Sequence, residues 1–434
     1  MNSPLVPARN ISSTLQEEVL SVVLPSGLRV MFCPKPGFKK RYACYSTFYG
    51  SVDNSFIDHN GAECRVPDGI AHFLEHMLFE TEEGNVSDLF SRNGAYNNAA
   101  TSFTTTTYLF ASSDRFYENL KLLINFVEKP VFHPDKVEKE RGIIDQEIKG
   151  YGDEPSWVSY MGVLENLFAK HPMRIDIAGT SESIQEIDSD LLHRCYRTFY
   201  SPRNMILFVV GDLDASELFD FVAANSVAPD GASVARPVER RYPDESPGVF
   251  RSEAQREMAV ALPKLLVGFK DQETPMTGVD AVLHELTSEL ALEILFGRSS
   301  DTYQSLYEQQ LIMDDFGASY SQGAGVGYAM VGGDTPEPDR LHDVLYSSLN
   351  ERLTAGINAE DFDREKRRFI GGFIASFNSL EYIASHYTYY EFHEFNLFEA
   401  VDLLSRVTLD SVMDRLRSLV DASRSTRFTI EPRS

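Results

Sequence analysis

The chain has 434 residues, of which 43% are hydrophobic and 24% are charged, and these proportions are typical of a soluble globular protein. Its formal net charge of −25 argues against nucleic acid as a partner, because nucleic acids attract surfaces rich in Lys and Arg. No stretch approaches the roughly 20 uninterrupted apolar residues that a membrane helix needs. At this length we expect two domains of about 200 residues each.

The N-terminus has neither a basic start nor an apolar block, so we expect no export signal. The four cysteines contain no CxxC pair, and a disulfide framework is not expected in so large a chain. We therefore predict that the protein works in a reducing cytoplasm.

The first 67 residues predict strands and turns. Two strands, over residues 19–24 and 28–32, are joined by the turn Pro25-Ser-Gly27, and a third strand follows around residues 41–50. Residues 54–67 are polar and rich in turn formers, so we predict a loop that leads into the next helix.

Residues 69–79 read Gly-Ile-Ala-His-Phe-Leu-Glu-His-Met-Leu-Phe and predict a helix with a chemical function. In a helix His72 and His76 lie one turn apart, so both imidazoles can face one point, and Glu75 lies about 60° from His72. Either histidine alone would more often be a hydrogen-bonded core residue. Together, however, two imidazoles and a carboxylate cost several kcal/mol to bury unless something pairs them.

The His-x-x-Glu-His spacing is the inverzincin motif and predicts a zinc site. A catalytic zinc site uses three protein ligands, so a third must come from elsewhere in the chain. Glu75 is placed to act as the general base that takes a proton from water.

The residues after the metal helix predict a short helix and a strand. Residues 87–92 form the helix, with Ser87 as a plausible N-cap. Residues 94–110 are rich in Thr, Tyr and Phe and alternate from Thr101 onward. Such a strand can pair with an extended peptide by strand addition, although many such strands are sheet members with nothing bound.

Two helices follow, over residues 114–129 and from Pro134 to about Gly150. On the second helix an inward arc about 140° wide is marked by Val137, Ile143, Ile144 and Ile148. Glu140 and Glu147 fall inside this arc. An inward glutamate usually pairs with a buried Arg or Lys, but no such partner is evident here. One of the two is therefore predicted to be the third zinc ligand, and helix geometry leaves open which.

His72-Phe-Leu-Glu-His76, followed about seventy residues later by Glu140-Arg-Gly-Ile-Ile-Asp-Gln-Glu147, resembles the pitrilysin family of zinc peptidases. The resemblance implies that Glu147 is the third zinc ligand and that Glu140 supports catalysis without binding zinc. Asn98-Ala99-Ala100-Thr101 looks like the family's element that lines the peptide-binding edge of the cleft. The resemblance is strong over about residues 66–212, where Ile175–Thr180 and Tyr200–Met205 also match.

Residues 226–247 are polar and rich in Pro, so we place a linker there, between a zinc-bearing catalytic domain over 1–225 and a related inactive domain over 248–434. The second half predicts a strand near 257–269, a helix over 279–296, a strand pair within 318–333, helices over 336–354 and 359–383, two more helices and a closing strand at 427–430. This order repeats the first half without its metal residues. We predict an α+β fold of two related α/β halves, each a mostly antiparallel sheet packed with helices.

The second half also departs from the family. The resemblance leads us to expect a glycine-rich loop and then an Arg with a Tyr seven residues later, which grip the substrate backbone. Here Tyr307 stands in place of the Arg, and Asp314 in place of the Tyr. Some bacterial relatives pair a zinc-bearing subunit with a zinc-less one that carries the missing pair. We therefore expect this chain to join a second chain in a clam-like chamber, as the catalytic subunit of a heterodimer, with a homodimer as the alternative.

The leading hypothesis is a zinc metalloendopeptidase, with one zinc ion per chain, that hydrolyses short unfolded peptides bound as an added strand. A structural or assembly subunit of the same fold is the rival hypothesis, but loss of chemistry should break the motif residues, and all of them are intact. A dedicated peptidase that removes leader peptides is a narrower form of the first hypothesis.

Overall fold

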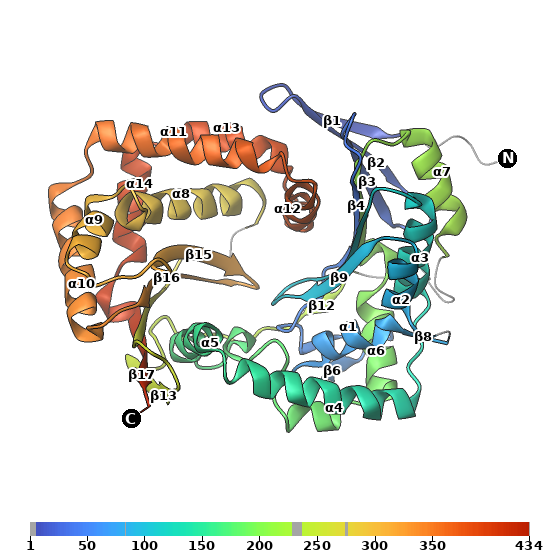
Figure 1. The fold of residues 1–434 in the computed structure, drawn as a ribbon, viewed down its shortest axis with the longest axis horizontal. Coiled ribbons are helices and arrows are strands. Elements are labelled where there is room, and N and C mark those ends of the chain that lie inside the picture. The colour runs from blue at the N-terminus through green and yellow to red at the C-terminus, as the bar shows by residue number, and fades with distance from the viewer. Residues whose placement is uncertain (1–5, 83, 228–236, 274–276, 434) are drawn as a thin grey trace. The chain divides into compact units, whose positions relative to one another are not determined.

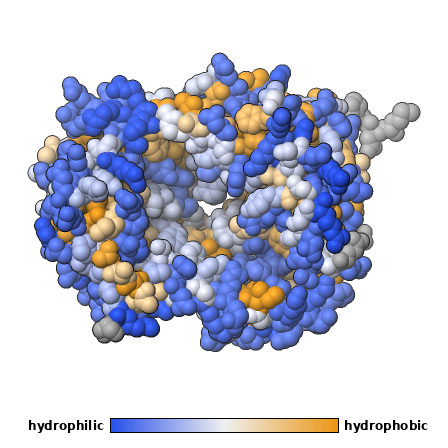
Figure 2. Space-filling view, in the orientation of Figure 1, coloured by the Kyte–Doolittle hydropathy of each residue, from blue (hydrophilic) through white to orange (hydrophobic). Residues whose placement is uncertain are grey.

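The computed structural model describes the chain except residues 1–5, 83, 228–236, 274–276 and 434. It consists of two compact units (Figure 1). Unit 1 comprises Met1–Ile148, Asp176–Arg241 and Ser376–Phe398, and unit 2 comprises Lys149–Ile175, Tyr242–Ala375 and Glu399–Ser434. The surface visible in Figure 2 is mostly hydrophilic, in keeping with the net charge of −25. Over the described residues, no helix has both the length and the apolar character to cross a membrane.

Unit 1 is built on a seven-stranded sheet that is antiparallel except for one parallel pair, β3 with β11. Its strands in spatial order are β1 (Ala8–Ser12), β2 (Glu17–Val23), β3 (Arg29–Pro34), β11 (Met205–Gly211), β4 (Arg41–Thr47), β10 (Thr106–Ser112) and β9 (Tyr96–Thr101). A three-stranded sheet joins β12 (Glu239–Arg240), β5 (Ser55–Ile57) and β6 (Glu63–Arg65), and a two-stranded one joins β7 (Glu80–Thr81) and β8 (Gly84–Asn85). The predicted loop over 54–67 therefore contains two short strands.

Helices cover both faces of this sheet. They are α1 (Ile70–Phe79), α2 (Val86–Arg92), α3 (Phe116–Glu128), α4 (Pro134–Tyr151), α6 (Ser189–Phe199), α7 (Ala215–Asn225) and α12 (Leu380–Phe392). Alternate residues of β4 face opposite sides. Tyr45 joins the core that holds α1 and α3, whereas the Cys44 thiol lies 3.8 Å from the Thr388 hydroxyl of α12. A helix from near the C-terminus thus covers the second face of the N-terminal sheet.

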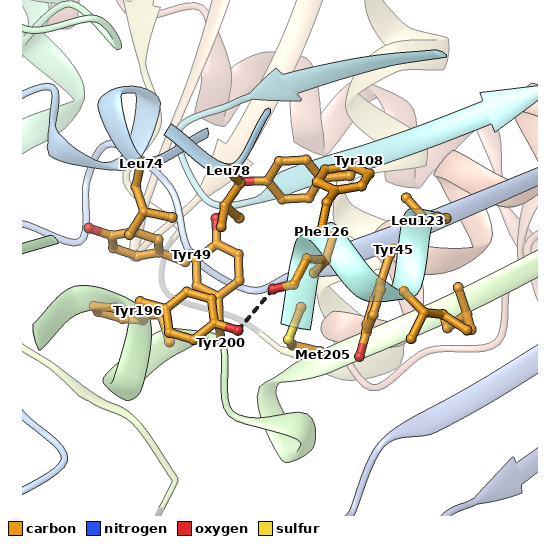
Figure 3. Packing of buried hydrophobic residues seen from close by; sticks show 14 of the residues in the cluster. Tyr45, Tyr49, Leu74, Leu78, Tyr108, Leu123, Phe126, Tyr196, Tyr200 and Met205 are labelled. Carbon is orange, nitrogen blue, oxygen red and sulfur yellow. Dashed lines mark hydrogen bonds between the residues drawn. The ribbon is translucent and has the colours of Figure 1, made fainter. Parts of the chain in front are cut away.

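The apolar core beneath α1 contains several buried tyrosines (Figure 3). Leu74 and Leu78 of α1 pack in the cluster that contains Tyr108 and Tyr200. The hydroxyls of these two tyrosines lie 2.7 Å apart, so each finds a partner inside the apolar core. This packing fixes the rotation of α1 and thereby the direction of its polar side chains.

Unit 2 contains a five-stranded sheet in the order β13 (Glu253–Met258), β17 (Ser425–Pro432), β14 (Lys264–Lys270), β16 (Val326–Asp334) and β15 (Gly317–Gly323). Its helices are α5 (Pro155–Leu167), α8 (Gly278–Phe296), α9 (Asp301–Glu308), α10 (Pro338–Ala355), α11 (Ala359–Ser376), α13 (Ala400–Arg406) and α14 (Leu409–Leu419). Helix α5, from the N-terminal half, packs closely on β17. A Cβ at Gly162 would lie 2.3 Å from the Phe428 ring, so only glycine permits this approach.

The two units repeat one plan, which confirms the predicted pair of related α/β halves. Each sheet has one parallel pair, β3 with β11 and β13 with β17, and each ends in an edge strand, β9 or β15. Helix α5, from the N-terminal half of the sequence, packs on the sheet of unit 2, and α12, from the C-terminal half, packs on the sheet of unit 1. The compact units are therefore not continuous stretches of sequence. The boundaries 1–225, 226–247 and 248–434 stay a prediction about sequence segments, and residues 228–236 of the linker lie outside the described part.

Besides the loop over 54–67, three further local predictions were wrong. Asn85, not Ser87, caps α2, because its side-chain oxygen accepts a hydrogen bond from the Ser87 amide. Ile143 is 45% exposed, since the buried arc of α4 is narrower than its apolar residues suggest. The predicted helix over 359–383 is interrupted after Ser376, and Ser379 caps the new helix α12.

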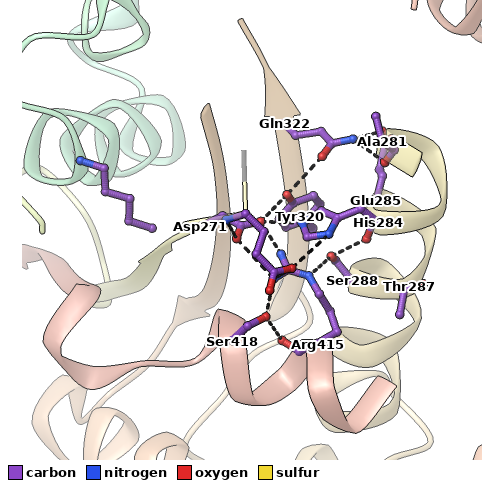
Figure 4. A network of polar contacts seen from close by, with 12 residues as sticks. Asp271, Ala281, His284, Glu285, Thr287, Ser288, Tyr320, Gln322, Arg415 and Ser418 are labelled. Atoms are coloured by element: carbon purple, nitrogen blue, oxygen red, sulfur yellow. Dashed lines mark hydrogen bonds and ion pairs between the residues drawn. The ribbon is translucent and has the colours of Figure 1, made fainter. Parts of the chain in front are cut away.

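A buried polar network connects α8, β15 and α14 in unit 2 (Figure 4). The Asp271 carboxylate accepts hydrogen bonds from Tyr320 at 2.6 Å, from His284 at 2.8 Å and from Arg415. Burial alone would raise the pKa of Asp271, but the bond from His284 and the charge of Arg415 outweigh burial and hold the pKa well below its usual range. The network therefore depends on every member keeping its partner.

We predict that Arg415→Met lowers the free energy of unfolding by about 3–5 kcal/mol, because the Asp271 charge would stay buried without its cation. Arg417→Met on the same helix is the matched control, since Arg417 pairs with Asp414 at the surface, where the side chains are 58% and 76% exposed. Urea unfolding of both variants checks this. Equal effects of the two substitutions would contradict it.

Candidate metal centre

Helix α1 begins where two backbone segments approach each other closely. Gly69, at its N-cap, has φ +88°, and a Cβ there would lie 2.3 Å from the carbonyl oxygen of Ala178. Only glycine accepts both the left-handed conformation and the contact. This start sets the register in which His72, Glu75 and His76 leave the helix on its polar side.

The structure brings the two histidines of α1 together with Glu147 of α4. Nε2 of His72 lies 3.8 Å from one carboxylate oxygen of Glu147, and Nε2 of His76 lies 3.4 Å from the other. The two imidazole centroids are 4.6 Å apart. One potential ligand atom from each residue fits within 4.8 Å of the others, and this is the one such group of metal-ligand side chains found in the described residues.

Glu140, one of the two inward acids of α4, contacts the histidine pair from the other side. Its carboxylate lies 2.8 Å from Nδ1 of His76 and is 6% exposed. In the part of the chain that the structure describes, no Lys or Arg pairs with Glu140, and the neighbouring Arg141 binds Glu138 instead. Glu140 occupies Nδ1 of His76, so Nε2 is the nitrogen that faces Glu147. The Glu140 carboxylate is therefore not directed at the point between Nε2 and Glu147.

This donor set fits a zinc ion. Bonds of about 2.0–2.1 Å in a tetrahedron place neighbouring ligand atoms about 3.3 Å apart. The separations of 3.4 and 3.8 Å are close to that value and are too long for good hydrogen bonds between the same atoms. Two imidazole nitrogens and one carboxylate also form a common set for zinc sites that keep an open fourth position.

Burial and charge act differently on the two histidines. Burial, helped by the neighbouring His76, lowers the pKa of His72 to about 4, so its ring is neutral at pH 7. Burial also opposes the charge on His76, but the hydrogen bonds to Glu140 and Glu147 outweigh it and raise the pKa to about 10. A metal ion at Nε2 of His76 would take the place of that proton.

Glu75 is buried beside this group and has its own hydrogen-bond donor. It is 8% exposed, and burial raises the pKa of its carboxyl group. The hydroxyl of Thr101, at the end of β9, donates to its Oε2 at 2.6 Å. Thr101 is the last residue of the predicted peptide-binding element Asn98–Thr101, but no local pattern in the sequence indicates this contact, which joins residues 26 positions apart.

The segment 94–110, predicted as one β-rich stretch, is the hairpin of β9 and β10. Strand β9 contains Asn98, Ala99 and Ala100 and lies at the edge of the seven-stranded sheet. Asn98 and Ala100 are exposed, whereas Ala99 is half-buried. Helix α1 contacts β9, so this edge lies next to the helix that carries the histidines.

The positions in unit 2 that repeat the metal motif hold other residues. Aligned at their Leu-Phe ends, α8 has Glu289 and Glu293 at the positions of His72 and His76 of α1, and Leu292 at the position of Glu75. Helices α4 and α11 both have 18 residues. When they are aligned at their first residues, α11 has Glu365 and Gly372 at the positions of Glu140 and Glu147 of α4. At these aligned positions of α8 and α11, unit 2 therefore has no counterpart of the Glu75 and Glu147 carboxylates.

An arginine lies among these acids of unit 2. The Arg368 guanidinium pairs with Glu293 and lies 2.7 Å from Glu365, which is 3% exposed. Glu365 is thus a buried acid, as Glu140 is in unit 1. Its charge is balanced by a side chain of the protein itself.

Comparisons with known proteins match two consecutive parts of the chain to one family. A family model described as "Insulinase (Peptidase family M16)" matches residues 62–181, and one described as "Peptidase M16 inactive domain" matches residues 186–369. The uncharacterized zinc protease YmfH of Bacillus subtilis (strain 168) is 44% identical over 423 residues, which cover 97% of this chain and 98% of YmfH. The putative zinc protease AlbF of Bacillus subtilis is 28% identical over 193 residues, 44% of this chain and 45% of AlbF.

Solved structures share the fold. A putative M16-like peptidase from Alicyclobacillus acidocaldarius superposes with a TM-score of 0.90 at 32% identity and covers both chains fully. Pitrilysin superposes with a TM-score of 0.74 at 16% identity, and the match covers all of this chain but 47% of pitrilysin. The predicted resemblance to the pitrilysin family is confirmed, and the chain belongs to the M16 family of zinc peptidases.

Proposed function

We propose that the protein is a zinc metalloendopeptidase, with zinc bound by His72, His76 and Glu147. The observation that carries this proposal is the convergence of these three side chains next to the buried carboxylate of Glu75. The relatives named as zinc proteases support the same metal. When bound, zinc would supply a Lewis acid that polarises the peptide carbonyl and acidifies water.

The side chains of this chain then divide the remaining work. Glu75 takes a proton from the attacking water at its carboxylate and returns it to the leaving amine, a role that suits a carboxyl group whose pKa is raised by burial. Glu140 holds His76 at Nδ1 and so keeps Nε2 directed at the metal, a contact that is typically worth 10–100-fold in metal affinity or activity.

The substrate, in this proposal, is an unfolded peptide that pairs with the edge strand β9. Asn98, Ala99 and Ala100 would contact the peptide backbone, since an edge strand of a sheet offers unpaired amides and carbonyls to an extended chain. Small side chains at Ala99 and Ala100 leave room for that approach. Selection would follow from the length and flexibility of the peptide.

We also propose that this chain is the catalytic subunit of a heterodimer in the cytoplasm. Tyr307 is 58% exposed and stands where the family resemblance leads us to expect the first residue of the Arg and Tyr pair. The second position holds Asp314. A homologous subunit without zinc would supply the missing pair, and a homodimer is the alternative.

Zinc binding tests the ligand set. We expect one zinc ion per chain by elemental analysis, because the described residues contain one group of potential zinc ligands. Glu147→Gln should lower the zinc content well below one per chain, since a neutral amide is a poor zinc ligand. Glu138→Gln on the same helix is the control and should retain zinc, because Glu138 is exposed and binds Arg141. Full zinc occupancy in Glu147→Gln would contradict the assignment.

Cleavage of a mixed set of unstructured quenched peptides tests the activity. We expect Glu75→Gln to lower the rate by at least about 10²-fold while zinc stays bound, because the amide cannot accept the proton. A chelated sample should lose activity and regain it with zinc. Activity unaffected by Glu75→Gln would sink the proposed mechanism, and full turnover by the purified chain alone would contradict the need for a partner subunit.

A further inference from the structure

We propose that Thr101 is a positioning residue, whose hydroxyl holds the Glu75 carboxylate and joins it to the strand on which the peptide is bound. This inference rests on the proposed function, in which Glu75 is the base and β9 the binding strand. It assigns to Thr101 a role beyond contact with the peptide.

The contact between the two residues is short and buried. Thr101 Oγ1 lies 2.6 Å from Glu75 Oε2, the usual length of a hydrogen bond from a hydroxyl to a charged carboxylate. Over the described residues, no other side chain donates a hydrogen bond to Glu75, and its further donor is the backbone amide of Thr101 itself. A carboxylate on a buried helix is costly without donors, so Thr101 stabilises both its charge and its orientation.

The direction of the Thr101 hydroxyl is fixed by its surroundings. Its register partner Thr106 donates its own proton to the carbonyl oxygen of Tyr49 at 2.9 Å. Thr106 therefore has no proton left for Thr101, whose oxygen lies 3.4 Å away. The proton of Thr101 goes to Glu75, which as a carboxylate can only accept.

One strand thus fixes both the base and the peptide. Thr101 is the last residue of β9, and Ala99 and Ala100 precede it directly. A peptide that pairs with the edge of β9 orders the same backbone that carries the Thr101 hydroxyl. Loss of the hydroxyl should therefore affect the chemical step and leave peptide binding to the strand unchanged.

The experiment compares Thr101→Val, which has the same shape but no hydroxyl, with Thr101→Ser, which keeps the donor. We expect Thr101→Val to lower kcat by about 10-fold or more with KM within about 2-fold, since small misplacement of a catalytic group is costly. Thr101→Ser should restore most of kcat. Thr107→Val is the control, because the Thr107 hydroxyl lies 2.8 Å from Ser46 and not at the site. All variants should hold one zinc ion per chain.

A crystal structure of metal-free Thr101→Val supplies a measurement that does not depend on activity. We expect the Glu75 carboxylate to leave its present position, and a carboxylate that stays in place would overturn the inference. Unchanged kcat in Thr101→Val beside an active wild type would overturn it as well. A wild-type protein that binds zinc but cleaves no peptide, alone or with a partner, would instead contradict the proposed function and leave the crystallographic test of Thr101 intact.

Discussion

The candidate site depends on charge compensation inside a small buried volume. Two imidazoles and the carboxylates of Glu75, Glu140 and Glu147 lie between α1, α4 and β9, where unpaired charge would cost several kcal/mol. The burial of each of these polar groups is tolerated because another polar group lies opposite it. Glu140 faces Nδ1 of His76, Glu147 faces both Nε2 atoms, and Thr101 faces Glu75. A divalent cation would offset two of the three acid charges, because a metal ion at the Nε2 atoms leaves both rings neutral.

In unit 2 the charges of the acids at the corresponding positions are compensated in another way. Its helices α8 and α11 repeat α1 and α4, but Arg368 lies between Glu293 and Glu365. A guanidinium carries its charge permanently and needs no metal, so this unit can be stable without an ion. Leu292 and Gly372 stand at the positions of Glu75 and Glu147, so unit 2 lacks two of the side chains that the proposed mechanism uses in unit 1. The two units therefore share one fold, and among the described residues the group of potential metal ligands lies in unit 1.

The exchange of helices affects how the site is built. Helix α12 covers the sheet of unit 1, and α5 covers the sheet of unit 2. One face of each sheet is therefore covered by a helix from the other half of the sequence. Strand β4 beneath α1 is packed by α3 and by α12. Strand β9 remains at the edge beside α1, and it carries the residue that holds the carboxylate of Glu75.

The sequence by itself determined the zinc motif, the two inward acids of α4 and the repeated α/β plan, because helical spacing and apolar periodicity are local properties of the chain. The family resemblance predicted Glu147 and not Glu140 as the third ligand. In the structure Glu140 contacts Nδ1 of His76, while Glu147 faces both rings. Only the tertiary structure placed the hydroxyl of Thr101 on Glu75, exposed Ile143 and exchanged α5 and α12 between the sheets. These features arise from contacts between residues far apart in the chain, which no local pattern records.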